Sequence, residues 1–387
     1  MMQIALFTNM ENIQSLLESD ERISNVIRFS EFEEKEIHCD AVLLSGDVVR
    51  PNELRSYREK FPKIPVIYKM ARTTNAENVA TICNVYDIKP LYEYLTEVQT
   101  VNKLFQIVFG DKNESKTNVV SFFGTHSGAG LSTTVLNVGK VLSESIQHKV
   151  LILSLNPWDP SDYFLPYEGK YLDDIQIELQ NELFTEESLK EAVVSYSSNF
   201  FHLAGNRNIK LQRFYKEQQV DRLIEIAKQT FDIVLIDAGA HFDNAAYAQS
   251  YLSSDLKFLI TTQEEKGWQS YFPHIYNQLI KPVQQSKDDY ILIINRYEKE
   301  MNLIRDIDLQ EKMEMNLLTT IANQNIFGHI AVSQKKLLVN LVEGDYRESM
   351  QIIANSIIKR TNLTPNENVD LDFKKRKKLF GFIPVKA

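Results

Sequence analysis

Cysteine, glycine and proline are scarce in these 387 residues, and the sequence has no long hydrophobic run. The two cysteines, Cys39 and Cys83, are too few for a disulfide framework or a cysteine metal cluster, which indicates a reducing compartment. The 13 glycines and 11 prolines exclude a collagen-like or low-complexity chain. No apolar run approaches the ~18 residues of a membrane-spanning helix. The first residues lack the basic and apolar regions of a signal peptide, so we expect a cytoplasmic protein.

What is present is the composition of a folded protein with an acidic body. Hydrophobic residues make up 43% of the chain and charged residues 25%, and the length suggests about two or three domains. The net charge is −9, although Phe373–Ala387 holds six basic residues and no acidic one. An acidic body argues against a broad nucleic-acid-binding face, so DNA is not expected as a partner.

Residues 1–110 alternate short apolar strands with helical patterns, which predicts a small doubly wound α/β domain. Strands are expected at 4–7, 26–29, 41–44, 65–68 and 82–86, and a helix over 91–105. Residues 111–117 are polar throughout and form the best linker candidate. A second series follows over 118–361, with strands expected at 119–123, 150–153, 231–236, 257–260 and 290–294. The fold class is therefore α/β, with two doubly wound parallel-sheet domains.

A glycine-containing loop lies between a predicted strand and a predicted helix, at residues 124–134. Gly128 and Gly130 would let backbone N–H groups close around an anion, and the helix N-terminus would add its dipole. Ser132 or Thr133 would offer a hydroxyl to a metal ion or a phosphate. The context is typical of a phosphate-binding loop. The alternative is that the two glycines only permit a tight turn and close helix packing.

Residues 118–361 resemble the MinD/ParA family of deviant P-loop ATPases. The family loop reads Lys-Gly-Gly-x-Gly-Lys-Thr-Thr, and residues 126–133 read His-Ser-Gly-Ala-Gly-Leu-Ser-Thr. Leu131 replaces the lysine that neutralises the β- and γ-phosphates, and His126 replaces the lysine that reaches across the dimer. The family's Asp-x-Asp-Pro motif has become Ser154-Leu155-Asn156-Pro157, so both of its carboxylates are lost.

Other parts of the family pattern are retained. The strand 231–237 resembles the Walker B strand and ends in Asp237, Asn295 lies where the family often contacts adenine, and 327–344 resembles the closing strand and helix. The resemblance implies ATP with magnesium as the cofactors that such a site could hold. The nucleotide contacts that it implies are Gly128, Ala129, Gly130, Leu131, Ser132, Thr133, Asp237 and Asn295.

The missing lysines separate three hypotheses about activity. Phosphoryl transfer depends on positioning and charge neutralisation, and leucine supplies neither. Nucleotide binding without efficient hydrolysis is the first hypothesis, and a loop with only a structural role is the second. A competent ATPase, in which Asp237 orients a metal-bound water, is the third. His126 is interpreted as a loop histidine, and Trp158 as a packing or partner contact.

The N-terminal domain resembles a response-regulator receiver, on the order of its strands and helices. Ser45 stands at the place of the phosphorylated aspartate, Thr8-Asn9 at the place of the acidic magnesium-binding pair, and Lys89-Pro90 matches the family's Lys-Pro. Asp47 is interpreted as a turn residue. Without an acceptor carboxylate no aspartyl phosphate can form, so the domain is expected to act in docking or dimerisation.

The pairing of the two domains resembles the TadZ/CpaE group, which positions and helps to assemble pilus secretion machinery at bacterial cell poles. The resemblance implies a non-enzymatic or weakly nucleotide-binding scaffold. Its expected partners are pilus or secretion assembly proteins, and a second copy of the chain in a homodimer is a further candidate. One alternative is an active MinD/ParA-type ATPase switch that positions DNA, flagella or division machinery. Another is a signalling adaptor whose receiver-like half binds a kinase or regulator.

The tail 362–387 is both basic and aromatic. A cation near an anionic membrane is worth roughly 1 kcal/mol, and MinD proteins end in a basic amphipathic membrane-targeting segment. The tail therefore predicts a protein that is peripheral at the inner face of the membrane, and the TadZ/CpaE resemblance adds the cell pole as a candidate position. The alternatives are a solvated tail or a tail that binds an acidic partner. The residues expected to contact the membrane are Lys374, Lys375, Arg376, Lys377, Lys378, Leu379, Phe380 and Phe382.

Overall fold

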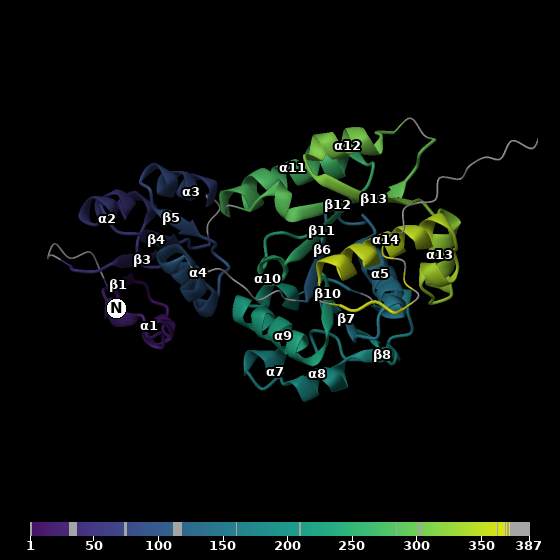
Figure 1. Cartoon of the computed structure of the whole chain (residues 1–387), viewed down its shortest axis with the longest axis horizontal. Coiled ribbons are helices and arrows are strands. Elements are labelled where there is room, and N and C mark those ends of the chain that lie inside the picture. Colours follow the sequence, from purple (N-terminus) through teal and green to yellow (C-terminus); the bar gives the residue numbers. More distant parts are fainter. Residues whose placement is uncertain are drawn as a thin grey trace, which may run out of the picture.

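A computed structural model of the chain contains two α/β units, each built around its own sheet (Figure 1). It describes residues 2–30, 37–72, 76–110, 118–159, 161–208, 210–283, 285–300, 303–361, 363–367, 369 and 371. The expected linker 111–117 and the basic part of the tail lie outside these residues. Within the described residues, no helix has the length and apolar character needed to cross a membrane.

The N-terminal unit has a five-stranded sheet whose paired strands are all parallel. Its order, β2-β1-β3-β4-β5, is that of flavodoxin-like folds. The central strand β3 is buried along its whole length, as expected for a strand covered by helices on both faces. The strands are β1 Met2–Phe7, β2 Ile23–Arg28, β3 Ala41–Ser45, β4 Val66–Lys69 and β5 Lys89–Leu91, and the helices are α1 Ile13–Glu18, η1 Pro51–Glu53, α2 Leu54–Lys60, α3 Ala76–Val85 and α4 Glu97–Phe109.

Two expectations for this unit are wrong. The run 82–86 is not a strand, because most of it belongs to α3, where Cys83 is buried and Val85 is 72% exposed, as on opposite faces of a helix. The fifth strand is instead the three-residue β5, which is too short to give an apolar run and which contains Lys89-Pro90. The last helix begins at Glu97, not near residue 91, because the Thr96 side chain accepts a hydrogen bond from Gln99 N at 3.2 Å and caps it.

The larger unit has an eight-stranded sheet in the order β13-β12-β11-β6-β10-β7-β9-β8. Its paired strands are parallel except for β8 and β9. The predicted fold class, α/β with two parallel-sheet units, is thereby confirmed. The strands are β6 Val119–Gly124, β7 Val150–Ser154, β8 Val194–Ser197, β9 Phe200–Leu203, β10 Ile233–Asp237, β11 Leu256–Thr261, β12 Tyr290–Tyr297 and β13 Asn316–Ala322.

Helices cover both faces of this sheet. Side chains of α5 and α14 share one buried cluster with the sheet, and side chains of α9 and α10 share the cluster on its other face. The α-helices are α5 Leu131–Ser145, α6 Ser161–Phe164, α7 Gln176–Gln180, α8 Glu186–Ala192, α9 Glu217–Thr230, α10 Ala245–Ser253, α11 Tyr271–Ile275, α12 Asp306–Met313, α13 Ile326–Ser333 and α14 Asp345–Arg360. The remaining helical turns are η2 Leu211–Phe214, η3 Lys266–Ser270, η4 Tyr276–Ile280, η5 Lys281–Val283, η6 Lys287–Asp289 and η7 Leu338–Asn340.

The closing strand was expected within 327–344, and this is also wrong. Its apolar start belongs to α13, where Ile326 is 65% and Phe327 45% exposed. The last strand among the described residues is β13, which ends at Ala322, before this run begins. An exposed apolar helix end has the composition of a buried strand, so the pattern alone could not separate the two.

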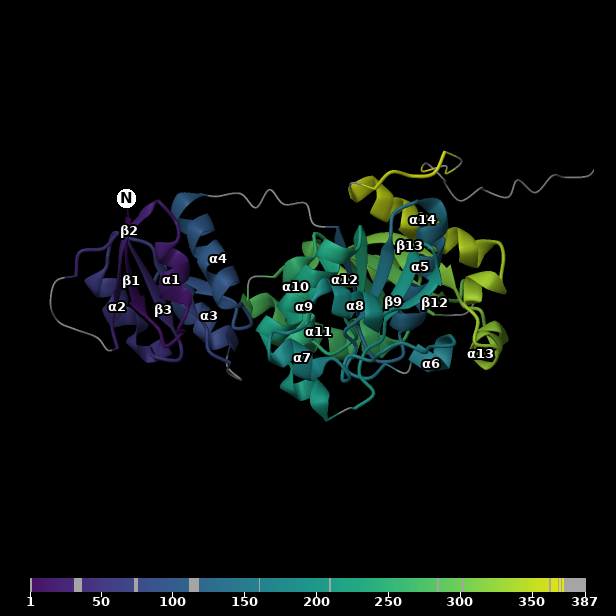
Figure 2. The same cartoon turned by 90° about the horizontal axis from the view of Figure 1, so that it is seen from below.

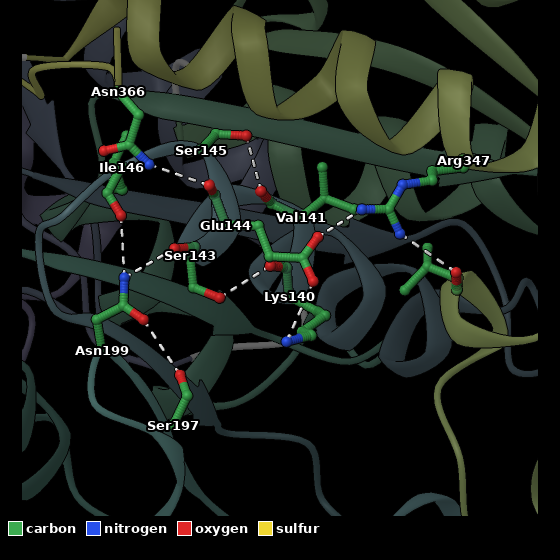
Figure 3. A network of polar contacts seen from close by, with 11 residues as sticks. Lys140, Val141, Ser143, Glu144, Ser145, Ile146, Ser197, Asn199, Arg347 and Asn366 are labelled. Atoms are coloured by element: carbon green, nitrogen blue, oxygen red, sulfur yellow. Dashed lines mark hydrogen bonds and ion pairs between the residues drawn. The ribbon is translucent and has the colours of Figure 1, made fainter. Parts of the chain in front are cut away.

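Helix α5 is held at its C-terminal end by a polar network (Figure 3). Asn199 Nδ2 donates to the carbonyls of Ser143 (2.7 Å) and Ile146 (2.9 Å), and Asn366 Nδ2 donates to that of Glu144 (3.1 Å). Arg347 of α14 forms an ion pair with the Glu144 carboxylate at 2.5 Å. These contacts satisfy carbonyls that a helix end otherwise leaves without partners. They fix the helix whose other end begins at the glycine loop.

Candidate functional site

A cleft of about 1270 Å³ opens at the carboxyl end of the larger sheet. Its walls are the loop 126–134 and the segments that follow β7, β10, β12 and β13. Open α/β sheets bind ligands at this edge, where loops from neighbouring strands meet. Of the predicted contacts, the cleft is lined by Gly128, Ala129, Gly130, Leu131, Ser132, Thr133 and Asn295, and Asp237 lies directly behind it at the end of β10.

The glycine loop is formed as the sequence suggests. Gly128 (φ +85°) and Gly130 (φ +83°) both have left-handed backbone conformations, which favour glycine. A Cβ on Gly130 would lie 2.2 Å from Asn295 Nδ2, whereas a Cβ on Gly128 would meet nothing within 4 Å. The first backbone bond into α5 runs from Thr134 N to Gly130 O at 3.0 Å, so the preceding amides have no partner within the helix. A helix start of this kind favours an anion.

Leu131 cannot take the place of a cation. It is only 7% exposed, and its side chain belongs to the buried cluster that α5 shares with the sheet. The position that the resemblance assigns to the phosphate lysine is therefore occupied by part of the hydrophobic core. Lysine and arginine side chains among the described residues of the cleft are limited to Arg296 and Lys336, both of them exposed.

His126 is also buried, with 4% exposure. Its Nδ1 lies 2.9 Å from Thr125 Oγ1 and its Nε2 lies 3.5 Å from Thr262 Oγ1, so the ring is held between the ends of β6 and β11. Burial lowers the pKa of His126, which disfavours the charged ring near neutral pH. The side chain is thus a packed part of the fold and brings no fixed positive charge to the cleft.

Asp237 is the most unusual group of the site. It is 2% exposed, accepts the Gly239 N–H at 3.1 Å, and is hydrogen-bonded by the side chains of Ser132 and Asn156. Burial, together with the nearby carboxylate of Asp159, raises the pKa of Asp237 to about 7 and so favours the neutral form. A hydroxyl, an amide and a carboxylate converge here, and magnesium prefers oxygen ligands of this kind. The donor set therefore fits a magnesium ion.

Two neighbours of Asp237 were missed by the sequence reasoning. Asp159 is 4% exposed and accepts the Gly205 N–H at 3.1 Å, and Ser154, next to Asp237 in the sheet, has a buried hydroxyl without a hydrogen-bond partner in the structure described. No signal marks Asp159 in the sequence, because it is one acid in a polar loop. Ser154 was recognised only as a lost carboxylate.

Asn295 holds the glycine loop from the opposite wall. Its Nδ2 donates to Ala129 O at 2.8 Å, and its Oδ1 accepts the Arg296 N–H at 2.9 Å. Both side-chain groups are therefore used within the protein, and the side chain is 8% exposed. Its contact with adenine stays a prediction. Trp158, which also lines the cleft, is 54% exposed.

The carboxyl edge of the N-terminal sheet carries no acceptor aspartate at the expected place. Ser45 is buried there, Asp47 accepts the Asn9 N–H at 2.9 Å, and Lys69 extends its ammonium to the carbonyl of Glu93 at 3.0 Å. Lys69 lies beside Ser45 in the sheet, and burial lowers its pKa. Asp47 thus behaves as the turn residue it was interpreted to be, and a lysine amine fills part of this edge.

The comparisons with known proteins agree with this architecture. No protein-family model and no curated protein matches the sequence. Among solved structures, a ParA family ATPase from Chlorobium tepidum is similar over 62% of this chain and 99% of its own, at 17% identity and a TM-score of 0.55. The septum site-determining protein MinD of Pyrococcus horikoshii, complexed with Mg-ADP, covers 62% of this chain and 96% of its own, at 18% identity and a TM-score of 0.50.

A third solved structure, the MinC:MinD cell division complex of Aquifex aeolicus, gives the same picture, with 16% identity and a TM-score of 0.50 over 62% of this chain and 96% of that chain. Likeness at this level of identity shows a shared fold. Over 62% of its length, this chain has the P-loop fold of the MinD and ParA ATPases.

Proposed function

We propose that this chain is an assembly or localisation factor that binds a nucleotide weakly and hydrolyses it slowly or not at all. The observation that carries the proposal is the side chain of Leu131, which is 7% exposed and packs in the core at the position of the phosphate lysine. Amides of the loop and the start of α5 can still bind a phosphate. They do not supply the mobile positive charge that phosphoryl transfer needs.

The cofactors that fit are a nucleotide di- or triphosphate and magnesium. Ser132 and Asp237 would hold the metal ion, and the amides of 128–133 would hold the phosphates. The magnesium ion, when bound, neutralises part of the phosphate charge. The Pyrococcus horikoshii MinD, complexed with Mg-ADP, supports this choice of cofactors by analogy of fold.

Calorimetry with ATP and with ADP, each with magnesium, tests the binding half of the proposal, and a phosphate-release assay tests the other half. We expect a modest affinity, and a turnover no faster than that of Asp237→Ala. A turnover that disappears in Asp237→Ala would refute the proposal that the chain hydrolyses nucleotide slowly or not at all. The absence of binding at millimolar nucleotide would leave the glycine loop with the structural role alone.

An active ATPase switch is the second candidate, and one observation favours it. Ser132, Asn156 and Asp237 are already hydrogen-bonded to one another, so the metal side of the site is formed although the lysines are missing. This candidate requires that Arg296 or Lys336, the exposed cations of the cleft, reach the phosphates. Turnover that falls in Arg296→Ala or in Lys336→Ala would establish it.

The cellular role that we propose is a scaffold for a membrane-associated pilus or secretion machine, as in the TadZ/CpaE group, with the receiver-like N-terminal unit as a docking or dimerisation module. The Aquifex aeolicus structure, in which MinD is in complex with MinC, supports a protein partner by analogy. Light scattering of the full chain and of residues 118–387 would show whether removal of the N-terminal unit changes the oligomeric mass. If both proteins contain the same number of chains per particle, dimerisation through that unit is refuted.

The tail would hold the scaffold at the inner face of an anionic membrane, through the basic and aromatic residues 374–382. Full-length protein should sediment with vesicles of anionic lipid at low salt and not with neutral vesicles, because cations near an anionic surface contribute about 1 kcal/mol each. Removal of 373–387 should abolish sedimentation. Equal sedimentation of the shortened chain would place the membrane contact elsewhere.

A further inference from the structure

The N-terminal unit docks on the larger unit through α3, which packs against η4 and η5, and through α4 with the turn before it, and both helices lie on the side that faces the larger unit (Figures 1 and 2). The Tyr94 hydroxyl donates to Asp243 Oδ1 at 2.8 Å, and the Tyr94 carbonyl accepts from Gln249 Nε2 at 2.8 Å. Arg72 pairs with Glu217, and its guanidinium lies 4.8 Å from the centre of the Tyr94 ring. Tyr94 is thus the centre of the polar part of the contact.

Two glutamine side chains extend this polar part of the contact. The amides of Gln99 and Gln249 exchange two hydrogen bonds, at 2.7 and 3.2 Å, and Gln99 Nε2 also lies 3.1 Å from Asp221 Oδ1. Gln249 is fully buried. Apolar side chains of both units also share one buried cluster next to these bonds, which includes Leu95 of the N-terminal unit and Phe272 of the larger unit. The paired polar groups therefore specify one docked arrangement, and the shared apolar cluster also stabilises it.

The loop 238–244 connects this contact with the cleft. At its start, the Gly239 N–H donates to Asp237 Oδ1 at 3.1 Å, and the Gly239 carbonyl accepts the Gly124 N–H at 3.0 Å. At its end, Asp243 accepts the Tyr94 hydroxyl. One short loop is therefore tied at one end to the carboxylate behind the cleft and at the other end to the N-terminal unit.

A cavity of about 290 Å³ lies between the two units, against the same loop. Arg72 and Tyr94 line it from the N-terminal side, and Phe242 and Asp243 line it from the loop. His241 of the loop and Pro157, which follows Asn156, line both this cavity and the large cleft. The loop 238–244 thus separates the cleft from the smaller cavity. It has room to move toward the cavity when the bond between Asp243 and Tyr94 is lost.

We propose that the docked N-terminal unit braces this wall of the cleft through the Tyr94–Asp243 contact, so that docking of the unit and occupation of the cleft are coupled. The identity of the occupant, a nucleotide, rests on the proposed function. A loop fixed at both ends loses less conformational entropy when a ligand orders it. Release of the outer end therefore weakens ligand binding. By linkage, a bound nucleotide strengthens the docking by the same factor.

Hydrogen exchange of the full-length chain tests the brace without any ligand. In Tyr94→Phe, amides of the loop 238–244 should exchange about twofold to tenfold faster than in the native protein, the range expected from the loss of one hydrogen bond. Tyr251→Phe is the matched control, because it removes a similar bond, from the Tyr251 hydroxyl to Asp289 at 2.6 Å, which involves neither the loop nor the N-terminal unit.

The coupling is tested with ADP and magnesium in calorimetry. Tyr94→Phe should raise the dissociation constant about twofold to tenfold. Asp243→Ala removes the same bond from the other side, so the double variant should be no weaker than the worse single variant. Tyr251→Phe should bind like the native protein.

The outcomes separate the two proposals. Loop exchange in Tyr94→Phe equal to that in Tyr251→Phe overturns the brace, whatever the nucleotide does. Faster loop exchange with unchanged ADP affinity overturns the coupling. Faster loop exchange in a chain that binds no ADP at all upholds the brace and removes the proposed nucleotide function.

Discussion

Replacement of Asp237 with asparagine should protect the folded protein against alkaline pH. The carboxyl is 2% exposed, and its neighbours are the neutral donors of Ser132, Asn156 and Gly239 together with a second acid, Asp159. Burial raises its pKa from 3.8 to about 7. The folded chain therefore holds this proton more tightly than the unfolded chain does.

The sign and the size of the effect follow from proton linkage. Because the pKa is higher in the folded state, the stabilisation is fully present below about pH 4 and is lost as the pH rises to about 7. Each unit within that window changes the free energy of unfolding by about 1.4 kcal/mol. Between pH 5 and pH 8.5 the native protein should thus lose about 2 to 3 kcal/mol that the asparagine variant does not lose.

Urea unfolding followed by circular dichroism at pH 5, 6, 7 and 8.5 measures this difference. Subtraction of the Asp237→Asn curve from the native curve removes the titration of all other groups. Asp232→Asn is the control, since that carboxylate precedes the same strand and its side chain is 49% exposed. Parallel loss of stability in the native and Asp237→Asn proteins would show that the carboxyl is already ionised without strain, and would refute the reasoning.

Three further predictions concern the glycine loop. Leu131→Lys should lower the free energy of unfolding by about 2–4 kcal/mol, since it places an ammonium in an apolar site. The same variant should bind MgATP more tightly in calorimetry, and unchanged binding would show that this position does not face the phosphates. Gly130→Ala should destabilise the fold by about 1–3 kcal/mol more than Gly128→Ala in thermal unfolding, because both have positive φ but only the first Cβ meets Asn295 Nδ2; equal losses would count against the clash. Asn295→Ala should cost about 1 kcal/mol and leave the Ala129 carbonyl without its partner, which faster exchange of the loop amides would report.

The sequence predicts those parts of the fold that depend on long buried runs. β3, β7 and β10 are buried along their whole lengths, and their apolar runs made them visible without a structure. The glycine loop was visible for a related reason, because left-handed positions such as Gly128 and Gly130 restrict the residue type. Both features depend on residue types within a short stretch of the sequence, so they can be recognised without the structure.

The errors arise where local sequence does not decide the structure. β5 has three residues, too few to show a period, while the apolar end of α3 and the exposed start of α13 each resembled a strand. Asp159 and Tyr94 carry no local signal at all. Each matters only because the chain brings it to a partner far away in the sequence, at Gly205 and Asp243 respectively.

The two kinds of feature in the cleft differ in what they say about a ligand. Gly130 is required by the close approach of Asn295, so the loop would keep its shape in a protein that binds nothing. No comparable packing contact explains why position 237 is an aspartate. An ionised carboxyl at this site opposes folding by up to about 4 kcal/mol at alkaline pH, as its pKa of about 7 against 3.8 implies. Asparagine would make similar hydrogen bonds at lower cost. The buried acid, more than the glycine loop, is therefore the reason to look for a cation, and with it a nucleotide, in this cleft.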